Sequence, residues 1–340
     1  MTQGPKKLSS VERRRREMKR QRKMAKAITA AKEALAEVLR MDRKRRHHVV
    51  WRYYLEPWSD SQGRIWCQGG GHRFKTATEN VGVWNDFYEL KEMSNADLLW
   101  IELIVSRIKS EEDRAFIRSW LPMFRNAFSM RDLLKKGNIV DSDIEKAIQI
   151  YISNAEEELH SSVETSALNF LPDLRRGDGS RLLSDSAYAD FAFFLGLQFS
   201  RTAALQAKTL PAFKELPGVN PRAMWGPLRI IFATNIGKDL FRNREKTRIE
   251  FLECPSTNGF ITGDQPIVNL GGVDHIKFLY PLSPSVSMVL TPESEAPGMA
   301  TRVITQSETD EYNRKIAVAS DRQIFASTEA ALAPFSICTD

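Results

Sequence analysis

The sequence predicts an α+β protein with one core, in which strands at both ends of the folded part flank a helical middle. Three observations predict this class. Residues 49–55 alternate as in a strand, apolar residues between about 96 and 242 recur at helical spacing, and short strand-like runs follow residue 248. The 340 residues, 42% of them hydrophobic and 27% charged, suit a soluble protein of one large domain or two smaller ones.

A basic segment precedes the domain, and we expect residues 1–45 to form a long basic helical arm. Residues 1–50 contain 17 Lys or Arg and 5 Asp or Glu, a net charge of +12, whereas the whole chain carries +6. The first ten or so residues are expected to be disordered. A helix then runs from about 11 to 42, because apolar residues from Met24 onward recur at helical spacing.

The folded domain is expected over residues 46–328, with a tail at 329–340. An N-terminal β-hairpin opens it, with strands at 49–58 and 64–68 and a flexible loop or bulge at 69–72. Helices follow, and after them mostly antiparallel strands with one helix inserted. The expected helices are 96–108, 113–128 with a kink or end near Pro122, 142–171, 186–208, 222–242 and 307–319; the expected strands are 248–254, 259–270, 276–283, 285–292 and 322–328.

Cysteine usage and hydropathy indicate a cytoplasmic protein that does not enter a membrane. The three cysteines, Cys67, Cys254 and Cys338, are odd in number and form no C-x-x-C pair, so neither a disulfide framework nor a zinc ribbon is expected. The first twenty residues contain no apolar core of a signal peptide, and the most apolar run, 191–199, is too short to span a bilayer.

Several motifs, in order along residues 46–328, resemble a bacterial and phage family known as domain of unknown function 4238. They are "HHVVWRYYL" with Trp58, "VGVWNDFYEL" at 81–90, "EEELHSSVE" at 156–164, "QFSRT" at 198–202, "FITGDQPIV" at 260–268, "PLSP" at 281–284, and Tyr312-Asn313 before "RQIFAS". Val50 and Gly263 depart from the family pattern. The resemblance implies the fold but brings no activity with it, and the basic arm lies outside it.

The arm is the expected nucleic-acid contact. Lys and Arg side chains on a helix release counterions from phosphates, which gives sequence-independent, salt-sensitive binding. The alternative is a solvated extension or a helix that binds a protein partner. The candidate contacts are Arg13, Arg14, Arg15, Arg16, Lys19, Arg20, Arg22, Lys23, Arg43, Lys44, Arg45 and Arg46.

His47, His48 and Asp264 are candidate catalytic residues. Adjacent residues of a strand point to opposite faces, so one of the two histidines can serve as a general base or metal ligand. The other interpretation is a hydrogen-bonding histidine at a strand start. Asp264 lies in a turn between Gly263 and Pro266, where its carboxylate can bind a metal, act as a base, or bind backbone N–H groups in an Asx-turn.

Two further candidates, Glu164 and Arg201, lie on helices. Glu157, His160 and Glu164 share one helix face with the Glu-x-x-His spacing of a metal site, but the second such motif is missing, so a solvated polar face is favoured. Glu164 borders the apolar stripe and is kept as a candidate. Arg201 ends the most apolar helix, where it can bind a phosphate or form a structural salt bridge, for example to Glu164 or Asp264.

The leading hypothesis is a phosphodiesterase or nuclease-like hydrolase, assisted by a base or a divalent metal ion, with the arm holding nucleic acid. A metal ion would polarise the phosphate, with Asp264 and Glu164 as oxygen ligands. The alternative is a non-catalytic protein that binds nucleic acid or another partner. An enzyme acting on a nucleotide or small metabolite would require a closed pocket at the same residues. The sequence has no P-loop, Rossmann fingerprint, G-x-S-x-G or H-E-x-x-H motif.

Overall fold

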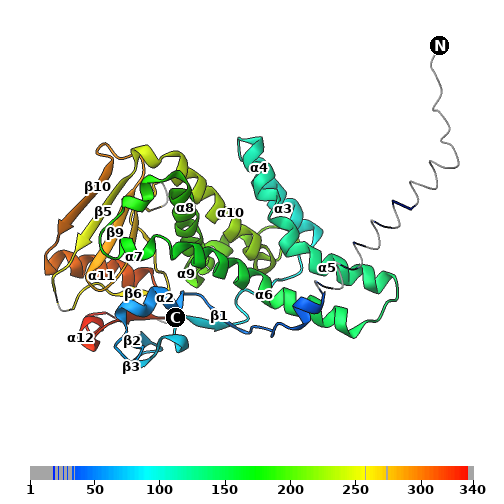
Figure 1. The fold of residues 1–340 in the computed structure, drawn as a ribbon, viewed down its shortest axis with the longest axis horizontal. Helices are drawn as coiled ribbons and strands as arrows, with labels where there is room; N and C mark the ends of the chain where they lie inside the picture. Colours follow the sequence, from blue (N-terminus) through cyan, green and yellow to red (C-terminus); the bar gives the residue numbers. More distant parts are fainter. Residues whose placement is uncertain are drawn as a thin grey trace, which may run out of the picture.

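The structure, a computed structural model, has the expected α+β architecture. It describes residues 18, 19, 22, 26, 29, 33, 35–256, 258–272 and 275–335. In Figure 1 the strands of the C-terminal half form one end of the molecule, α8 and α10 lie next to them, and α3 to α6 extend away from the sheets. Among the described residues, no helix is long and apolar enough to cross a membrane.

The helical middle is built around two central helices, α8 and α10, that pack against each other. Gly196 of α8 allows close packing against α10, since a Cβ at this position would lie 2.4 Å from the carbonyl oxygen of Ala233. The helices are α2 (Arg52–Leu55), α3 (Asn95–Ser106), α4 (Glu111–Arg118), α5 (Leu121–Lys136), α6 (Ser142–Ala167), α7 (Leu171–Leu174), α8 (Asp185–Ser200), α9 (Ala203–Thr209), α10 (Pro221–Arg242), α11 (Gln306–Ala319) and α12 (Glu329–Leu332).

In the described part of the chain the strands form three sheets, and all strand pairings there but one are antiparallel. The five-stranded sheet has the order β10-β5-β9-β8-β7, in which β10 runs parallel to β5; the other two have the orders β3-β2-β11-β6 and β1-β4. The strands are β1 (Arg46–His48), β2 (Arg64–Gly69), β3 (His72–Ala77), β4 (Val83–Asn85), β5 (Arg248–Glu253), β6 (Thr262–Gly263), β7 (Val268–Asn269), β8 (Phe278–Pro281), β9 (Val286–Thr291), β10 (Gly298–Val303) and β11 (Ile324–Ala326).

The N-terminal hairpin is formed by residues that lie further along the chain than predicted. The predicted strand 49–58 is wrong: it contains α2 and a 3₁₀ turn at Glu56–Trp58, which bury Tyr54, Leu55 and Trp58 on one side. The alternation of apolar residues therefore reflects a short helix with a buried face. The hairpin forms instead between β2 and β3, and the predicted loop 69–72 is its tight turn, with Gly70 and Gly71 at φ of 59° and 79°.

Two other predicted elements are divided. The predicted helix 186–208 breaks after α8, because the Thr202 side chain accepts the backbone N–H of Leu205 and begins α9. The predicted strand 259–270 contains only β6 and β7, separated by a turn around Pro266. Strand β10 has no counterpart in the prediction; most of its residues are exposed.

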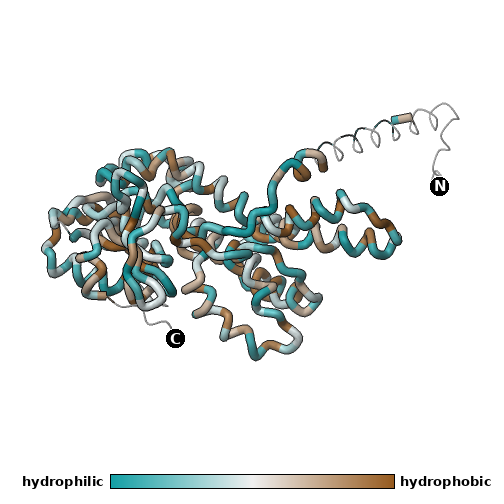
Figure 2. Tube along the Cα trace, turned by 90° about the horizontal axis from the view of Figure 1, so that it is seen from below, coloured by the Kyte–Doolittle hydropathy of each residue, from teal (hydrophilic) through white to brown (hydrophobic). Residues whose placement is uncertain are grey.

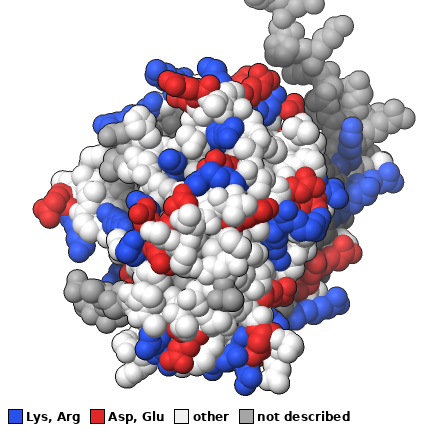
Figure 3. All heavy atoms as spheres, turned by 90° about the vertical axis from the view of Figure 1, so that its left-hand side faces the viewer, with Lys and Arg blue, Asp and Glu red and all other residues white. Residues whose placement is uncertain are grey.

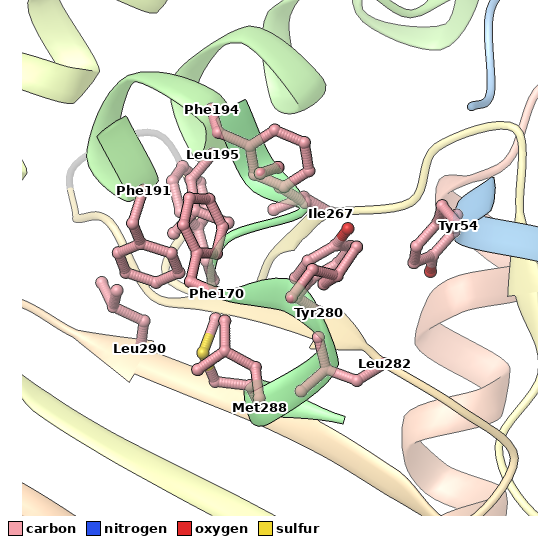
Figure 4. Close-up of a cluster of buried hydrophobic side chains, with 14 of the residues drawn as sticks. Tyr54, Phe170, Phe191, Phe194, Leu195, Ile267, Tyr280, Leu282, Met288 and Leu290 are labelled. Atoms are coloured by element: carbon pink, nitrogen blue, oxygen red, sulfur yellow. The ribbon is translucent and has the colours of Figure 1, made fainter. Parts of the chain in front are cut away.

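The main core lies where α7, α8 and the segment before α7 cover the five-stranded sheet. Figure 4 shows Phe170, Phe191, Phe194 and Leu195 facing Tyr280, Met288 and Leu290 of β8 and β9. The Tyr54 ring stacks on Tyr280 at a centroid distance of 5.2 Å, so α2 is fixed to the same core. This packing joins the N-terminal segment, the helices and the C-terminal sheet.

The described residues of the predicted arm are helical at 18, 19, 22, 26, 29, 33 and 35–39. Leu35 and Val38 line a cavity of about 320 Å³ together with Ala127 of α5 and Ile148 of α6. These two helices form a hairpin that extends away from the sheets and carries hydrophobic residues along its length (Figure 2). Arg13, Arg14, Arg15, Arg16, Arg20 and Lys23 lie outside the described residues.

Candidate functional site

The His47 side chain is bound through both ring nitrogens. Its Nδ1 accepts the backbone N–H of Tyr88 at 2.7 Å, which leaves Nε2 to donate to the Lys44 carbonyl at 3.2 Å. The ring is fully buried and stacks on Tyr88 with centroids 5.5 Å apart. Burial lowers the pKa of His47, so the ring is a neutral structural link between β1 and the segment that carries Tyr88.

His48 has a different environment, as expected for adjacent residues of a strand. Its backbone N–H donates to Glu157 Oε1 at 3.3 Å, and its Nε2 is buried without a partner among the described residues. Burial lowers the pKa of His48, and the Arg201 guanidinium lowers it further. His48 is therefore a neutral imidazole with one ring nitrogen available.

Arg201 closes α8 and donates to three acceptors. Its Nε donates to the Tyr88 hydroxyl at 2.9 Å, Nη1 to Glu164, and Nη2 to the His48 carbonyl oxygen. The side chain is 1% exposed. The structure thus brings together three of the predicted residues, His48, Glu164 and Arg201, and the predicted salt bridge between Arg201 and Glu164 is present.

The Glu157, His160 and Glu164 face of α6 is buried, so the prediction of a solvated polar face is wrong. The exposed fractions of these three residues are 8%, 1% and 7%. Arg201, at the end of α8, pairs with Glu164 of this face, and Arg229 of α10 pairs with the neighbouring Glu156, so two of the buried carboxylates of α6 are neutralised. Neither arginine is near α6 in the sequence, so the pattern of α6 alone did not reveal that its polar face is buried.

Glu157 has the pKa of a candidate general base. Burial raises the pKa of its carboxyl to about 7, although Arg201 and the His48 backbone N–H oppose the shift. Oε2 is buried and has no hydrogen-bond partner within the described part of the chain. A carboxyl that titrates near neutral pH and has a free oxygen is suited to accept a proton.

A second ion pair continues the cluster toward α10. Arg229 Nη2 donates to Glu156 Oε2 at 2.7 Å, and the guanidinium lies 4.8 Å from the centre of the Tyr88 ring. His160 lies between the two arginines, with Nε2 3.6 Å from Glu156 Oε1, and burial lowers its pKa to about 3. Tyr88, Glu156 and Arg229 were not predicted as site residues from the sequence; an arginine inside the apolar helix 222–242 was the available signal.

Asp264 binds backbone groups of a distant segment. Its carboxylate accepts the N–H groups of Asp321, Arg322 and Gln323 at 2.8, 2.7 and 2.9 Å. Burial raises its pKa to about 6 against these hydrogen bonds. One of the interpretations expected this carboxylate to bind backbone N–H groups, as it does. These N–H groups belong to residues after α11 and not to a local Asx-turn. Its neighbour Gln265 reaches Thr202, so the segments of Asp264 and Arg201 are adjacent, although no hydrogen bond or ion pair joins these two side chains within the described residues.

The described cations at the end of the arm are bound to the domain. Arg43 pairs with Glu89 at 2.9 Å, Lys44 with Glu158, and Arg45 with Asp86 at 3.1 Å. Arg46 donates to the Glu79 carbonyl at 3.0 Å. Four candidate phosphate contacts thus have protein partners, whereas Lys19 and Arg22 are exposed.

Metal ligands do not gather among the described residues. No group of three or more His, Cys, Asp or Glu side chains there could hold a metal ion. Glu164 and Asp264, the expected oxygen ligands, are bound to Arg201 and to backbone N–H groups, respectively. The candidate site is therefore a buried network of carboxylates, histidines and arginines.

These features define an α+β protein whose helical middle encloses a buried polar centre beside its sheets. The chain belongs to the family described as protein of unknown function (DUF4238), whose model matches residues 46–222 and 228–330. No curated protein and no solved structure matches the chain.

Proposed function

We propose that the protein is a base-assisted hydrolase of phosphodiesters, with Glu157 as the general base. The observation that carries the proposal is the Glu157 carboxyl, which has a pKa near 7, one oxygen without a hydrogen-bond partner among the described residues, and another that accepts the His48 backbone N–H. Arg201 is a positioning residue, because it holds both Glu164 and the backbone of His48. Asp264 orders the turn after α11 and has no catalytic part in this proposal.

In the proposed reaction, water attacks phosphorus while Glu157 takes one proton from it. The bond between phosphorus and the leaving sugar oxygen breaks, and that oxygen recovers a proton from solvent. General-base catalysis of this kind contributes roughly 10²–10⁴-fold to a rate.

The exposed Arg46 and Arg52 lower the pKa of His48 through their charges, so they lie near enough to attract a phosphate to this side of the domain.

The basic arm supports a polyanionic substrate. It contributes most of the 17 Lys or Arg found in residues 1–50, against 5 Asp or Glu. Figure 3 shows that acidic and basic side chains are interspersed on the sheet end of the domain, so this face offers no large positive patch for a polymer. We therefore assign polymer binding to the arm and cleavage to the domain.

The test compares wild type with Glu157→Gln on single-stranded and double-stranded DNA and RNA. We expect the substitution to reduce cleavage at least 100-fold, because glutamine accepts no proton. Glu158→Gln is the matched control, since Glu158 is the neighbouring residue and its side chain is 44% exposed. Each reaction is run with Mg²⁺ and with a chelator. Equal cleavage by wild type and Glu157→Gln would overturn the assignment of the base.

A second candidate function is a non-catalytic nucleic-acid or partner-binding protein. It is favoured by one observation: each of the three Arg201 nitrogens donates to an acceptor within the protein, and both oxygens of the Asp264 carboxylate accept backbone N–H groups. In this case the network is structural and nucleic acid binds through the arm without being cut. Salt-sensitive binding without cleavage by wild type, under all the conditions above, supports this candidate and refutes the hydrolase.

A further inference from the structure

We propose that a cavity between α6, α10 and the segment 87–91 binds the phosphate group of a small phosphorylated ligand. The cavity has a volume of about 100 Å³. That is well above the roughly 10–15 Å³ needed for one water molecule and is suited to a group of a few heavy atoms. The cavity is distinct from the site of Glu157 and His48. The proposal of phosphate binding does not depend on whether the protein is a hydrolase.

The floor of the cavity is a buried arginine with a free donor. Arg229 is 3% exposed, and its Nη2 is bound to Glu156. Its Nη1 is buried and has no partner among the described residues. An unsatisfied charged donor is costly inside a protein, so an acceptor that enters the cavity gains a strong, charge-assisted hydrogen bond.

The charges around the cavity favour an anion. Arg222 and Lys91 line it together with Arg229, and Arg43 pairs with its rim residue Glu89. The three lining cations face two lining carboxylates, Glu89 and Glu156, which leaves a surplus of one positive charge. Arg222 has no ion pair within the part of the chain that the structure describes and is exposed, so it is free to close over a ligand.

The start of α10 adds to this preference. Arg222 and Ala223 belong to the first turn of this 22-residue helix and both line the cavity. The N-terminus of a long helix carries a partial positive charge and favours anionic groups. Together with the unpaired Arg229 donor, it provides attraction from two directions.

The shape of the cavity depends on a glycine. A Cβ added to Gly226 would lie 2.7 Å from Phe124 Cε1 and 3.3 Å from Glu156 Oε2. The missing side chain therefore lets Phe124 and Glu156 approach α10 closely at this wall, and an added Cβ would displace them. Phe87 and Trp225 complete an aromatic lining, which suits a ligand whose phosphate is attached to an apolar or ring-bearing group.

The experiment measures binding of inorganic phosphate and of phenyl phosphate to the full chain by calorimetry. We expect both to bind, and Arg222→Ala to weaken each at least 10-fold, as is typical when one charged partner is removed. Arg107→Ala is the control, because Arg107 is exposed at the end of α3 and does not line the cavity. Tryptophan fluorescence is recorded in parallel because Trp225 lies in the cavity wall.

Two outcomes overturn the proposal: no binding of either ligand by folded wild type, or equal binding by Arg222→Ala and Arg107→Ala. A second variant, Gly226→Ala, is expected to reduce phenyl phosphate binding more than phosphate binding while circular dichroism shows a folded protein. Glu157→Gln separates this proposal from the hydrolase, since it should retain ligand binding even if cleavage is abolished. If wild type binds phosphate but cuts no nucleic acid, only the hydrolase fails.

Discussion

At the scale of single residues, the buried polar centre combines groups of very different proton affinity. Glu157 titrates near neutral pH, whereas His160, on the same helix face, is held neutral. Both shifts arise mainly from burial, which disfavours the charged form of either group. The two side chains therefore give separable responses to pH, one in the rate of the proposed reaction and the other in stability.

The Glu157 response is expected in the rate of the proposed hydrolysis. A general base must be deprotonated, so the cleavage rate should rise as the pH increases through about 7 and level off above it. The measurement is the rate at limiting substrate between pH 5.5 and about 8.5, taken at constant ionic strength. A rate that falls over this interval contradicts the role of Glu157.

The His160 response is expected in stability. Its pKa is lowered to about 3 in the folded protein, whereas a histidine in the unfolded chain titrates near its usual 6.5. Below the usual pKa of 6.5 the unfolded state binds a proton that the folded state does not. The free energy of unfolding therefore declines as the pH falls below neutral, by up to about 1.4 kcal/mol per pH unit.

His160→Gln isolates this contribution. Urea unfolding of wild type and variant at several pH values between about 7 and 5 gives the two slopes, and the variant should lose less stability per pH unit. The shallower slope, rather than the absolute stability, is the informative quantity, because the substitution also changes packing against Tyr88. Equal slopes would show that His160 does not carry the effect. His47 and His48, whose pKa values are also lowered, leave a residual slope in both proteins.

At the scale of secondary-structure elements, Asp264 joins the turn after β6 to the segment between α11 and β11. Asp264→Ala leaves three backbone N–H groups without their acceptor, and each such group costs about 1–3 kcal/mol when it stays buried. We expect the free energy of unfolding, measured with urea, to decrease by at least about 3 kcal/mol in total.

Two variants complete this test. Asp264→Asn retains one acceptor oxygen and should be destabilised less than Asp264→Ala. Glu311→Ala on the exposed side of α11 should change stability by less than about 0.5 kcal/mol. An Asp264→Ala protein that keeps full stability but no longer cleaves would instead indicate a direct part in catalysis.

The elements also show how far the sequence could be interpreted. The periodicity of α6 and α10 predicted both helices. For Arg201, at the end of an apolar helix, the sequence left open a bound phosphate or a salt bridge to Glu164 or Asp264, and the salt bridge to Glu164 is present. The segment 49–58 was misread because its apolar residues fit both a strand and a short helix. Strand β10 was missed because it is an exposed edge strand without an apolar repeat. The buried face of α6 includes Glu164 and adjoins Glu156, which pair with Arg201 and Arg229 from distant parts of the chain, and a local pattern does not contain these partners.

At the scale of the whole molecule, the positive charges of the N-terminal segment divide into two groups. Arg43, Lys44 and Arg45 are paired with carboxylates of the domain, whereas residues 1–23 contain ten further Lys or Arg. Only charges that meet phosphates release counterions, so the two groups should differ in their effect on nucleic-acid binding.

We expect deletion of residues 1–23 to weaken binding of duplex DNA and to reduce its salt dependence. The slope of log K against log salt concentration changes by about 0.9 for each phosphate that the protein no longer neutralises, so a decrease of several units is expected. Arg45→Ala should leave the slope unchanged, since Arg45 already has Asp86 as a partner. Equal slopes for the full and shortened chains would exclude the arm as the part that binds DNA.

The ion pair between Arg43 and Glu89 has a geometrical consequence. Glu89 lies at the rim of the cavity that we assign to a phosphate group, and Arg43 lies at the end of the basic segment. The chain therefore enters the domain at an anchored point beside that cavity. If the arm binds nucleic acid as we propose, insertion or deletion of residues before Arg43 would change the distance between the bound nucleic acid and the cavity, and would test whether the two parts act together.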